Sequence, residues 1–162
     1  MAPGWYVLRS KPNKEEFFWG QLIAHQVEVY YPCIQAKAAN PRAHKDKPYF
    51  PGHLFVHVDL QDEISFFLDG MPGSAGLVMF GEQPARVPDG LITTIRLWVD
   101  QINATGGEAT PGLGLEQMAG LHPDFSDGYA AIAGSGLSGN ERVHALLNVL
   151  RGRQAPVELS EV

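Results

Sequence analysis

The stretch YFPGHLFVHV at residues 49–58 places a Pro-Gly turn directly before an alternating apolar run. Pro51 and Gly52 mark the turn, because proline fixes φ and glycine tolerates positive φ. Successive side chains of a strand point to opposite faces, so the run predicts a strand from His53 to Asp59. The aromatic Phe55 on the more polar face indicates that this face is also covered or binds a partner. One face carries Leu54, Val56 and Val58, and the other carries His53, Phe55 and His57.

The sequence on both sides of this strand predicts three more strands and three helices. The segment Trp5–Arg9 is aromatic and β-branched, which favours a strand. A helix is expected from Lys14 to about Gln26, with Asn13 as its N-cap and Glu16 completing a capping box. This order of elements predicts the α+β class, with helices beside an antiparallel four-stranded sheet. The remaining elements are strands at 27–34 and 76–80, a short helix at 62–68, a loop at 84–88 and a final helix from Asp89.

A linker and a small C-terminal module follow the last predicted helix. Residues 104–114 contain four glycines and a proline, and they separate a domain at 4–103 from a module at 115–162. Within this module, residues 141–151 fit both a helical stripe and a strand alternation, so local propensity does not decide between them. Gly120, Pro123 and Gly128 disfavour a helix in the first part of the module, so a compact β module is preferred over a helical form.

Composition excludes several classes of protein. With 44% hydrophobic and 19% charged residues, the chain has the balance of a soluble globular protein. No apolar run reaches the ~18 residues of a membrane span, and the N-terminus lacks the features of a signal peptide, so a cytoplasmic location is expected. The single cysteine, Cys33, cannot form an internal disulfide and is expected to be a buried thiol.

The distribution of charge indicates where nucleic acid could bind. A net charge of −6 argues against nonspecific coating of nucleic acid. Residues 1–60 carry 7 Lys or Arg against 5 Asp or Glu, whereas residues 61–162 carry 5 against 13. Contacts are therefore expected from the first third of the chain, with a solvated surface as the alternative. The candidates are Lys11, Lys14 and His25 around the first helix, and Arg42, Lys45 and Lys47 in a basic, exposed loop at 36–48.

Several short motifs occur in a characteristic order: GWYVL at residues 4–8, YFPGHLFV at 49–56, MPG at 71–73, FG at 80–81 and PARVP at 84–88. Together they resemble the N-terminal (NGN) domain of the NusG family of bacterial transcription factors. The last two motifs are most similar to the specialised RfaH-like paralogues. Residues 128–132, 137–143 and 156–159 resemble strands of the small β-barrel, or KOW, domain of the same family. The resemblance implies an NGN domain followed by a KOW-like module with a degenerate first strand.

This resemblance implies a transcription elongation or antitermination factor, and not an enzyme. In the family, the N-terminal domain binds the clamp helices of RNA polymerase, bridges the cleft, contacts the non-template DNA strand and suppresses pausing or termination. The tail domain would bind a ribosomal protein or a termination factor, and no cofactor is implied. An aromatic cluster on a surface is a normal anchor for a protein partner. By motif matching, the polymerase-binding residues are Phe50, Phe55, Phe80 and Ile92, with Arg9 on the first strand.

Other motifs have simpler explanations than catalysis or cofactor binding. Gly134, Gly136 and Gly139 spell G-x-G-x-x-G, but too little chain follows for further βαβ units, so a flexible turn is expected. His53 and His57 share a strand face without a third ligand at metal spacing. The alternative function is a KOW-type RNA- or ribosome-binding module without polymerase contact, in which the predicted aromatic cluster would have no role.

Overall fold

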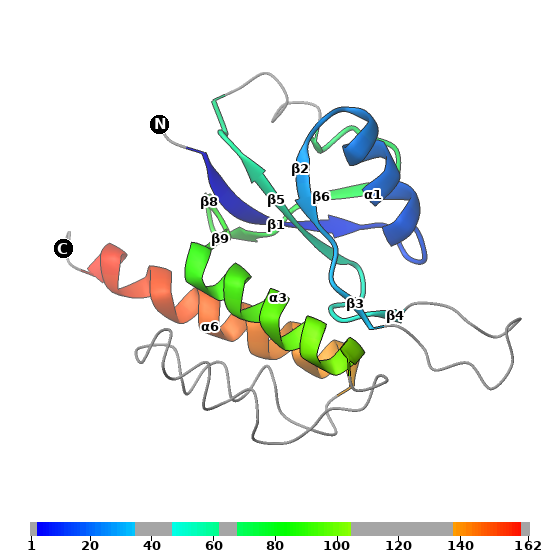
Figure 1. The fold of residues 1–162 in the computed structure, drawn as a ribbon. Coiled ribbons are helices and arrows are strands. Elements are labelled where there is room, and N and C mark those ends of the chain that lie inside the picture. The colour runs from blue at the N-terminus through cyan, green and yellow to red at the C-terminus, as the bar shows by residue number, and fades with distance from the viewer. Residues whose placement is uncertain (1–2, 35–46, 62–67, 105–137, 160–162) are drawn as a thin grey trace, which may run out of the picture. The chain divides into compact units, whose positions relative to one another are not determined.

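The computed structural model describes residues 3–34, 47–61, 68–104 and 138–159, with side chains up to Arg151 in the last range (Figure 1). Residues 62–67 of the predicted short helix, most of the basic loop, the linker from residue 105 onward and residues 115–137 lie outside these ranges. The chain forms two compact units, and each is described by itself. The first comprises Met1–Tyr31, Gly52–Asp89 and Leu147–Val162, and the second comprises Pro32–Pro51 and Gly90–Leu146.

The first unit is built on an antiparallel sheet. Its strands lie in the order β2 (Glu28–Tyr30), β5 (His53–Val58), β1 (Gly4–Ser10) and β6 (Ser74–Leu77), and β9 (Arg86–Val87) also pairs with β1. The four predicted strands are present, but the prediction of a loop at 84–88 is wrong. The short strand β6 pairs with β1 only from Leu8 onward. Trp5 and Tyr6 of β1 pair instead with β9. Unpaired backbone groups of a buried strand are costly, so β9 completes the ladder.

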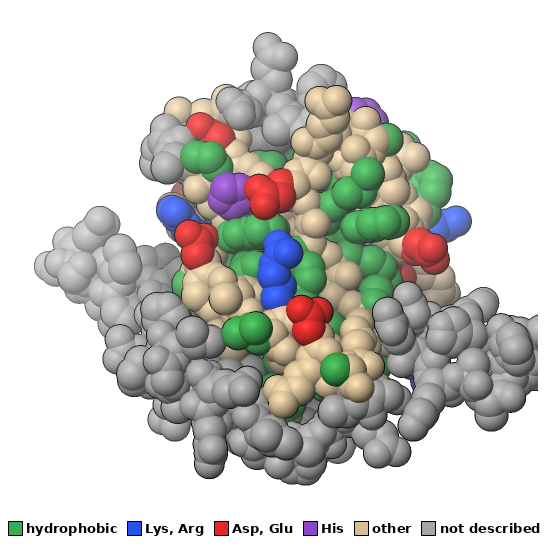
Figure 2. Space-filling model, in the orientation of Figure 1, with side chains coloured by type: hydrophobic (Ala, Val, Ile, Leu, Met, Phe, Trp, Pro, Cys, Tyr) green, Lys and Arg blue, Asp and Glu red, His purple; other side chains and the backbone are tan. Residues whose placement is uncertain are grey.

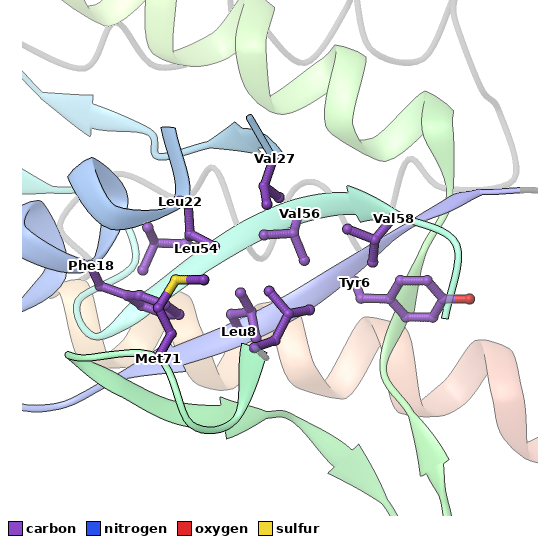
Figure 3. Close-up of a cluster of buried hydrophobic side chains, with 10 residues drawn as sticks. Tyr6, Leu8, Phe18, Leu22, Val27, Leu54, Val56, Val58 and Met71 are labelled. Atoms are coloured by element: carbon purple, nitrogen blue, oxygen red, sulfur yellow. The ribbon is translucent and has the colours of Figure 1, made fainter. Parts of the chain in front are cut away.

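The hydrophobic core of this unit lies between the sheet and α1 (Glu15–Ala24). Phe18 and Leu22, one turn apart on α1, are fully buried. Figure 3 shows them with the side chains of β1 and β5 that point toward the same core. Each such burial contributes roughly 1.5–3 kcal/mol. The strand residues in this core are Tyr6, Leu8, Leu54, Val56 and Val58, which confirms the predicted apolar face of β5.

The start of α1 differs from the predicted capping box. Asn13 adopts the left-handed conformation, with φ of 59°, and Lys14 is the N-cap without a side-chain hydrogen bond. The carboxylate of Glu15 instead accepts a hydrogen bond from the backbone N–H of Gly52 at 3.0 Å. Gly52 has φ of 74°, as the predicted turn requires. The helix is therefore tied to the turn before β5 and not capped by its own N-terminal residues.

The β7–β8 hairpin follows β6 in the first unit. The predicted strand at 76–80 is interrupted at Val78, and β7 (Met79–Phe80) pairs with β8 (Gln83–Pro84) around Gly81. Val78 donates its backbone N–H to Val7, and its carbonyl accepts from Ala85. The main chain of Val78 thus joins the hairpin to β1.

Helix α3 spans Asp89–Ala104 and belongs to the second unit from Gly90 onward. The second unit also contains the two short strands β3 (Cys33–Ile34) and β4 (Lys47–Pro48) and the first turns of α6. The predicted strand at 27–34 divides into β2 and β3 at Tyr31 and Pro32, where proline offers no N–H for a ladder. The predicted final helix is confirmed as α3. Its buried residues are Leu91, Ile92, Thr94, Ile95, Trp98, Val99 and Ile102.

The described part of the tail is a single helix, α6 (Gly139–Leu159). The predicted strands within these residues are wrong. Val143, Leu146 and Leu150 are buried and follow the helical spacing, whereas Ala145 and Val149, which a strand would place on the same face as Val143, are only partly buried. The helical stripe is therefore the one that packing selects. Among the described residues, no helix is long and apolar enough to cross a membrane.

Candidate functional site

The face of the sheet opposite the α1 core carries aromatic side chains in cross-strand rows. Val7 of β1, Phe55 of β5 and Tyr30 of β2 lie in register. The rings of Phe55 and Tyr30 stack at a centroid distance of 6.1 Å and an interplanar angle of 23°. Phe55 is fully buried, so the predicted second face of β5 is covered and does not lie open. Cross-strand aromatic contacts of this kind stabilise a sheet and also form a flat apolar surface.

The next row of the same face combines Trp5, His57 and Glu28, which also lie in register. His57 Nδ1 lies 3.0 Å from Glu28 Oε1, and its ring centroid is 5.1 Å from that of Trp5. The carboxylate and the indole therefore hold the imidazole in a structural role. No group of three potential metal ligands occurs among the described residues.

An arginine of α6 lies over the aromatic ring of β7 in the first unit. The guanidinium of Arg151 is 5.3 Å from the ring centroid of Phe80, within the range of a cation–π contact. Phe80 is half-buried, and its neighbour Met79 is exposed. The C-terminal helix thus contacts one of the residues predicted to bind polymerase.

A second arginine of α6 makes the equivalent contact in the second unit. The guanidinium of Arg142 lies 4.4 Å from the ring centroid of Tyr49, and Tyr49 packs edge-on against Phe50 at 5.0 Å. Burial raises the pKa of Tyr49, and this effect outweighs the opposing charge of Arg142 and the nearby Trp98 indole. The buried Nε1 of Trp98 lies near Tyr49 without normal hydrogen-bond geometry and makes only a weak polar contact with it.

The first turn of α6 is fixed by a capping box. The Ser138 hydroxyl accepts from the Glu141 N–H at 3.2 Å, and the Glu141 carboxylate accepts from the Ser138 N–H at 3.0 Å. These hydrogen bonds lower the pKa of Glu141. A Cβ on Gly139 would come within 2.5 Å of Pro51 Cγ, so the helix begins in close contact with the segment that carries Phe50. Gly139 of the G-x-G-x-x-G pattern therefore serves helix packing.

The predicted polymerase-binding residues are divided between the two units. Phe55 and Phe80 belong to the first unit, and Phe50 and Ile92 belong to the second. Phe50 and Phe55 are fully buried and Ile92 is 3% exposed, so the expectation of an open aromatic surface is not met by these residues. Arg9 is exposed on β1, where its guanidinium donates to the Ala75 carbonyl at 3.3 Å.

Four of the predicted nucleic-acid-binding residues are described, and all four are exposed. Lys11 and Lys14 flank the turn between β1 and α1, and Lys47 lies on β4. His25 follows α1, and its Nδ1 lies 2.8 Å from the Gln21 carbonyl, as for a donating N–H. Arg42 and Lys45 lie outside the described residues.

Sequence reasoning missed Tyr49, Arg142 and Arg151. Tyr49 was considered only as the residue before Phe50-Pro51-Gly52, and Arg142 and Arg151 were assigned to a β module. One signal was available: SGNE at residues 138–141 has the form of a capping box, which marks a helix start.

Comparison with known proteins identifies relatives for more than half of the chain. The family whose sequence profile matches residues 3–96 is NusG, described as "Transcription termination factor nusG". Among solved structures, "Domain interaction in Thermotoga maritima NusG" is similar, with 24% identity, coverage of 62% of this chain and a TM-score of 0.46. The match spans 59% of that solved chain. No curated protein matches.

Proposed function

Because this chain belongs to the NusG family, we propose that it is a transcription elongation or antitermination factor that binds the clamp helices of RNA polymerase. The family consists of transcription factors and not of enzymes. The proposed anchor residues are Phe50, Phe55, Phe80 and Ile92. Support comes from their chemistry, because buried aromatic and aliphatic side chains are the usual centres of protein interfaces once they are uncovered.

We further propose that the protein is an RfaH-like paralogue in which α6 competes with polymerase. The observation that carries this proposal is the pair of arginine contacts. In the first unit Arg151 lies on Phe80, and in the second Arg142 lies on Tyr49, the neighbour of Phe50. A partner that uses the Phe80 ring must displace Arg151, and a partner that uses the Tyr49 ring must displace Arg142, so α6 would lower the affinity for polymerase.

The strength of this effect follows from the fraction of molecules in which α6 is displaced. The apparent dissociation constant rises in inverse proportion to the competent fraction. If about 1% of molecules are open, the affinity falls about 100-fold. A signal that favours the open form would recruit the factor only where that signal occurs.

The proposed nucleic-acid partner is the non-template DNA strand, contacted through Lys11 and Lys14. Further candidates for this contact are His25 and the loop residues Arg42, Lys45 and Lys47.

The experiment that tests polymerase binding uses Phe80, because this side chain is half-buried and the fold does not depend on it as it does on Phe50 or Phe55. Phe80→Asp is made in a full-length chain that also carries Ala145→Pro, which breaks α6 and removes its competition. Binding to purified core polymerase should weaken about 30-fold or more, the size of a hot-spot loss.

Met79→Asp in the same background is the matched control, because Met79 is exposed on the same short strand. It should bind polymerase like the parent. Equal binding by the Phe80 and Met79 variants would refute the proposed aromatic anchor.

A further inference from the structure

We infer that Phe17 is a stacking platform for an unpaired nucleic-acid base, with Lys14 and Lys11 neutralising the adjoining phosphates. The inference deepens the proposed contact with the non-template strand and rests on that part of the proposed function. It assigns a role in base contact to an aromatic side chain that the charge pattern of the chain does not reveal.

The outer surface of α1 carries apolar side chains that do not pack in the core. Phe18 and Leu22 face the core, yet Phe17, Trp19 and Ile23 are 48%, 39% and 49% exposed. Figure 2 shows hydrophobic side chains at the surface on the side where α1 lies in Figure 1. A helix that only covers a core has polar residues on its outer face, so these side chains need another explanation.

The ring of Phe17 is held in place by the turn at Met71–Gly73. A Cβ on Gly73 would lie 3.1 Å from Phe17 Cδ2, so the ring rests against the glycine backbone. Gly73 has φ of 90°, and its carbonyl accepts from the Lys11 N–H at 2.8 Å. The ring and Lys11 are thus fixed against the same turn. An aromatic ring that is already fixed in place loses little conformational freedom when a base stacks on it, which favours binding.

The charges around Phe17 favour nucleic acid over a protein partner. The Lys14 ammonium lies 5.8 Å from the Phe17 ring centroid, and the exposed Lys11 precedes it by three residues. The two nearest carboxylates in sequence are Glu15, which is engaged with the Gly52 N–H, and Glu16, which lies about 100° from Phe17 around the helix axis. Lysines bind phosphates, and every base presents a flat π-face to an aromatic ring. An incoming base would take the place of the Lys14 ammonium on the ring and leave that charge free for a phosphate.

Trp19 provides a contrast on the same helix. It is separated from Phe17 by two positions, or about 200° around the helix axis. Glu16 and Ile23, three and four residues from Trp19, are its neighbours on the helix, and these helix neighbours include a carboxylate and no lysine. Trp19 therefore offers an exposed aromatic ring without the cations, which makes it the matched control.

The test measures binding of the full-length protein to a fluorescein-labelled single-stranded DNA of about 12 nucleotides by anisotropy. A second oligonucleotide of equal length carries abasic sites, so that it has the same phosphates and lacks bases. Phe17→Ala should weaken binding of the normal strand by about fivefold to 100-fold and leave binding of the abasic strand unchanged. Phe17→Trp should restore binding to the normal strand.

The dependence on salt separates stacking from charge. Phe17→Ala should keep the slope of log affinity against log salt, whereas Lys14→Ala should make the slope shallower by about 0.7, the value for one phosphate of a single strand. Trp19→Ala should behave like the wild type. The inference is overturned if wild type binds neither strand, if Phe17→Ala binds the normal strand within twofold of wild type, or if Trp19→Ala loses as much as Phe17→Ala. Because polymerase is absent from this assay, any of these results leaves the test of polymerase binding intact.

Discussion

The guanidinium of Arg142 on α6 lies 4.4 Å from the ring centroid of the buried Tyr49. Cation–π contacts contribute about 0.5–1 kcal/mol at exposed sites and about 2 kcal/mol or more where they are shielded from water. Arg142→Ala should therefore weaken the attachment of the first turns of α6 and increase their hydrogen exchange. His144→Ala, an exposed position on the same helix, should leave that exchange unchanged. If both variants exchange alike, the Arg142–Tyr49 contact does not hold the helix.

Gly139→Ala distinguishes a packed helix from a free one by the sign of its effect. In an exposed helix, alanine is more stable than glycine by up to about 1 kcal/mol. Here the new Cβ would meet Pro51 Cγ at 2.5 Å and Cδ at 2.7 Å, and overpacking of this kind costs about 1–3 kcal/mol. Thermal unfolding of Gly139→Ala should therefore occur at a lower temperature than that of wild type. Asn140→Ala, at an exposed position, should not lower it, and a gain in stability from Gly139→Ala would contradict the packed arrangement.

The capping box at Ser138 and Glu141 predicts a pH dependence of α6. The folded-state pKa of Glu141 lies below its usual value of 4.5, so the contribution of this carboxylate is present above that value. It is lost as the pH falls through the lower, folded pKa. Hydrogen exchange corrected for its intrinsic pH dependence should show the first turn of α6 loosening in this acid range. Glu141→Gln should remove that step, and an unchanged acid profile in this variant would exclude the assignment.

The hydrogen bond from the Gly52 N–H to the Glu15 carboxylate predicts a loss of stability when the acceptor is removed. Hydrogen bonds to charged groups contribute about 1.5–3 kcal/mol, with less expected here because Glu15 is partly exposed. Glu15→Ala should lower the midpoint of urea unfolding, and Glu15→Gln, which keeps an acceptor, should lower it less. Glu16→Ala is the control at the neighbouring exposed position. Similar midpoints for Glu15→Ala and Glu16→Ala would show that the link between α1 and the β5 turn is unimportant.

The elements with a single strong periodicity were predictable from the sequence. Leu54, Val56 and Val58 alternate without a competing helical pattern, and they form the core face of β5. The apolar residues of α3 that recur at helical spacing from Leu91 to Ile102 are buried, whereas Leu97, which lies off this stripe, is exposed. In both cases local pattern and tertiary packing favour the same structure, so the sequence alone was sufficient.

The elements decided by distant contacts were not predictable in the same way. Val143 and Leu147 belong to both a helical stripe and a strand alternation. In the described part of the tail the helix is accompanied by contacts of Arg142, Arg151 and Gly139 with residues distant in the sequence. The strand β9 exists because β6 pairs with only one end of β1, which no local pattern encodes. The sequence therefore identified the aromatic residues as candidates, but it did not predict the helix that contacts Phe80 and Tyr49.

Competition of α6 with RNA polymerase for the aromatic residues of this chain is the core of the proposed function. It is tested most directly by titrating labelled full-length protein with purified core polymerase, for wild type and for Ala145→Pro, whose proline breaks α6 at a cost of ~3 kcal/mol or more. Ala145→Ser, which keeps the helix, is the control. The account predicts that Ala145→Pro binds at least about tenfold more tightly than wild type and Ala145→Ser. Equal affinity of all three proteins for polymerase would contradict it.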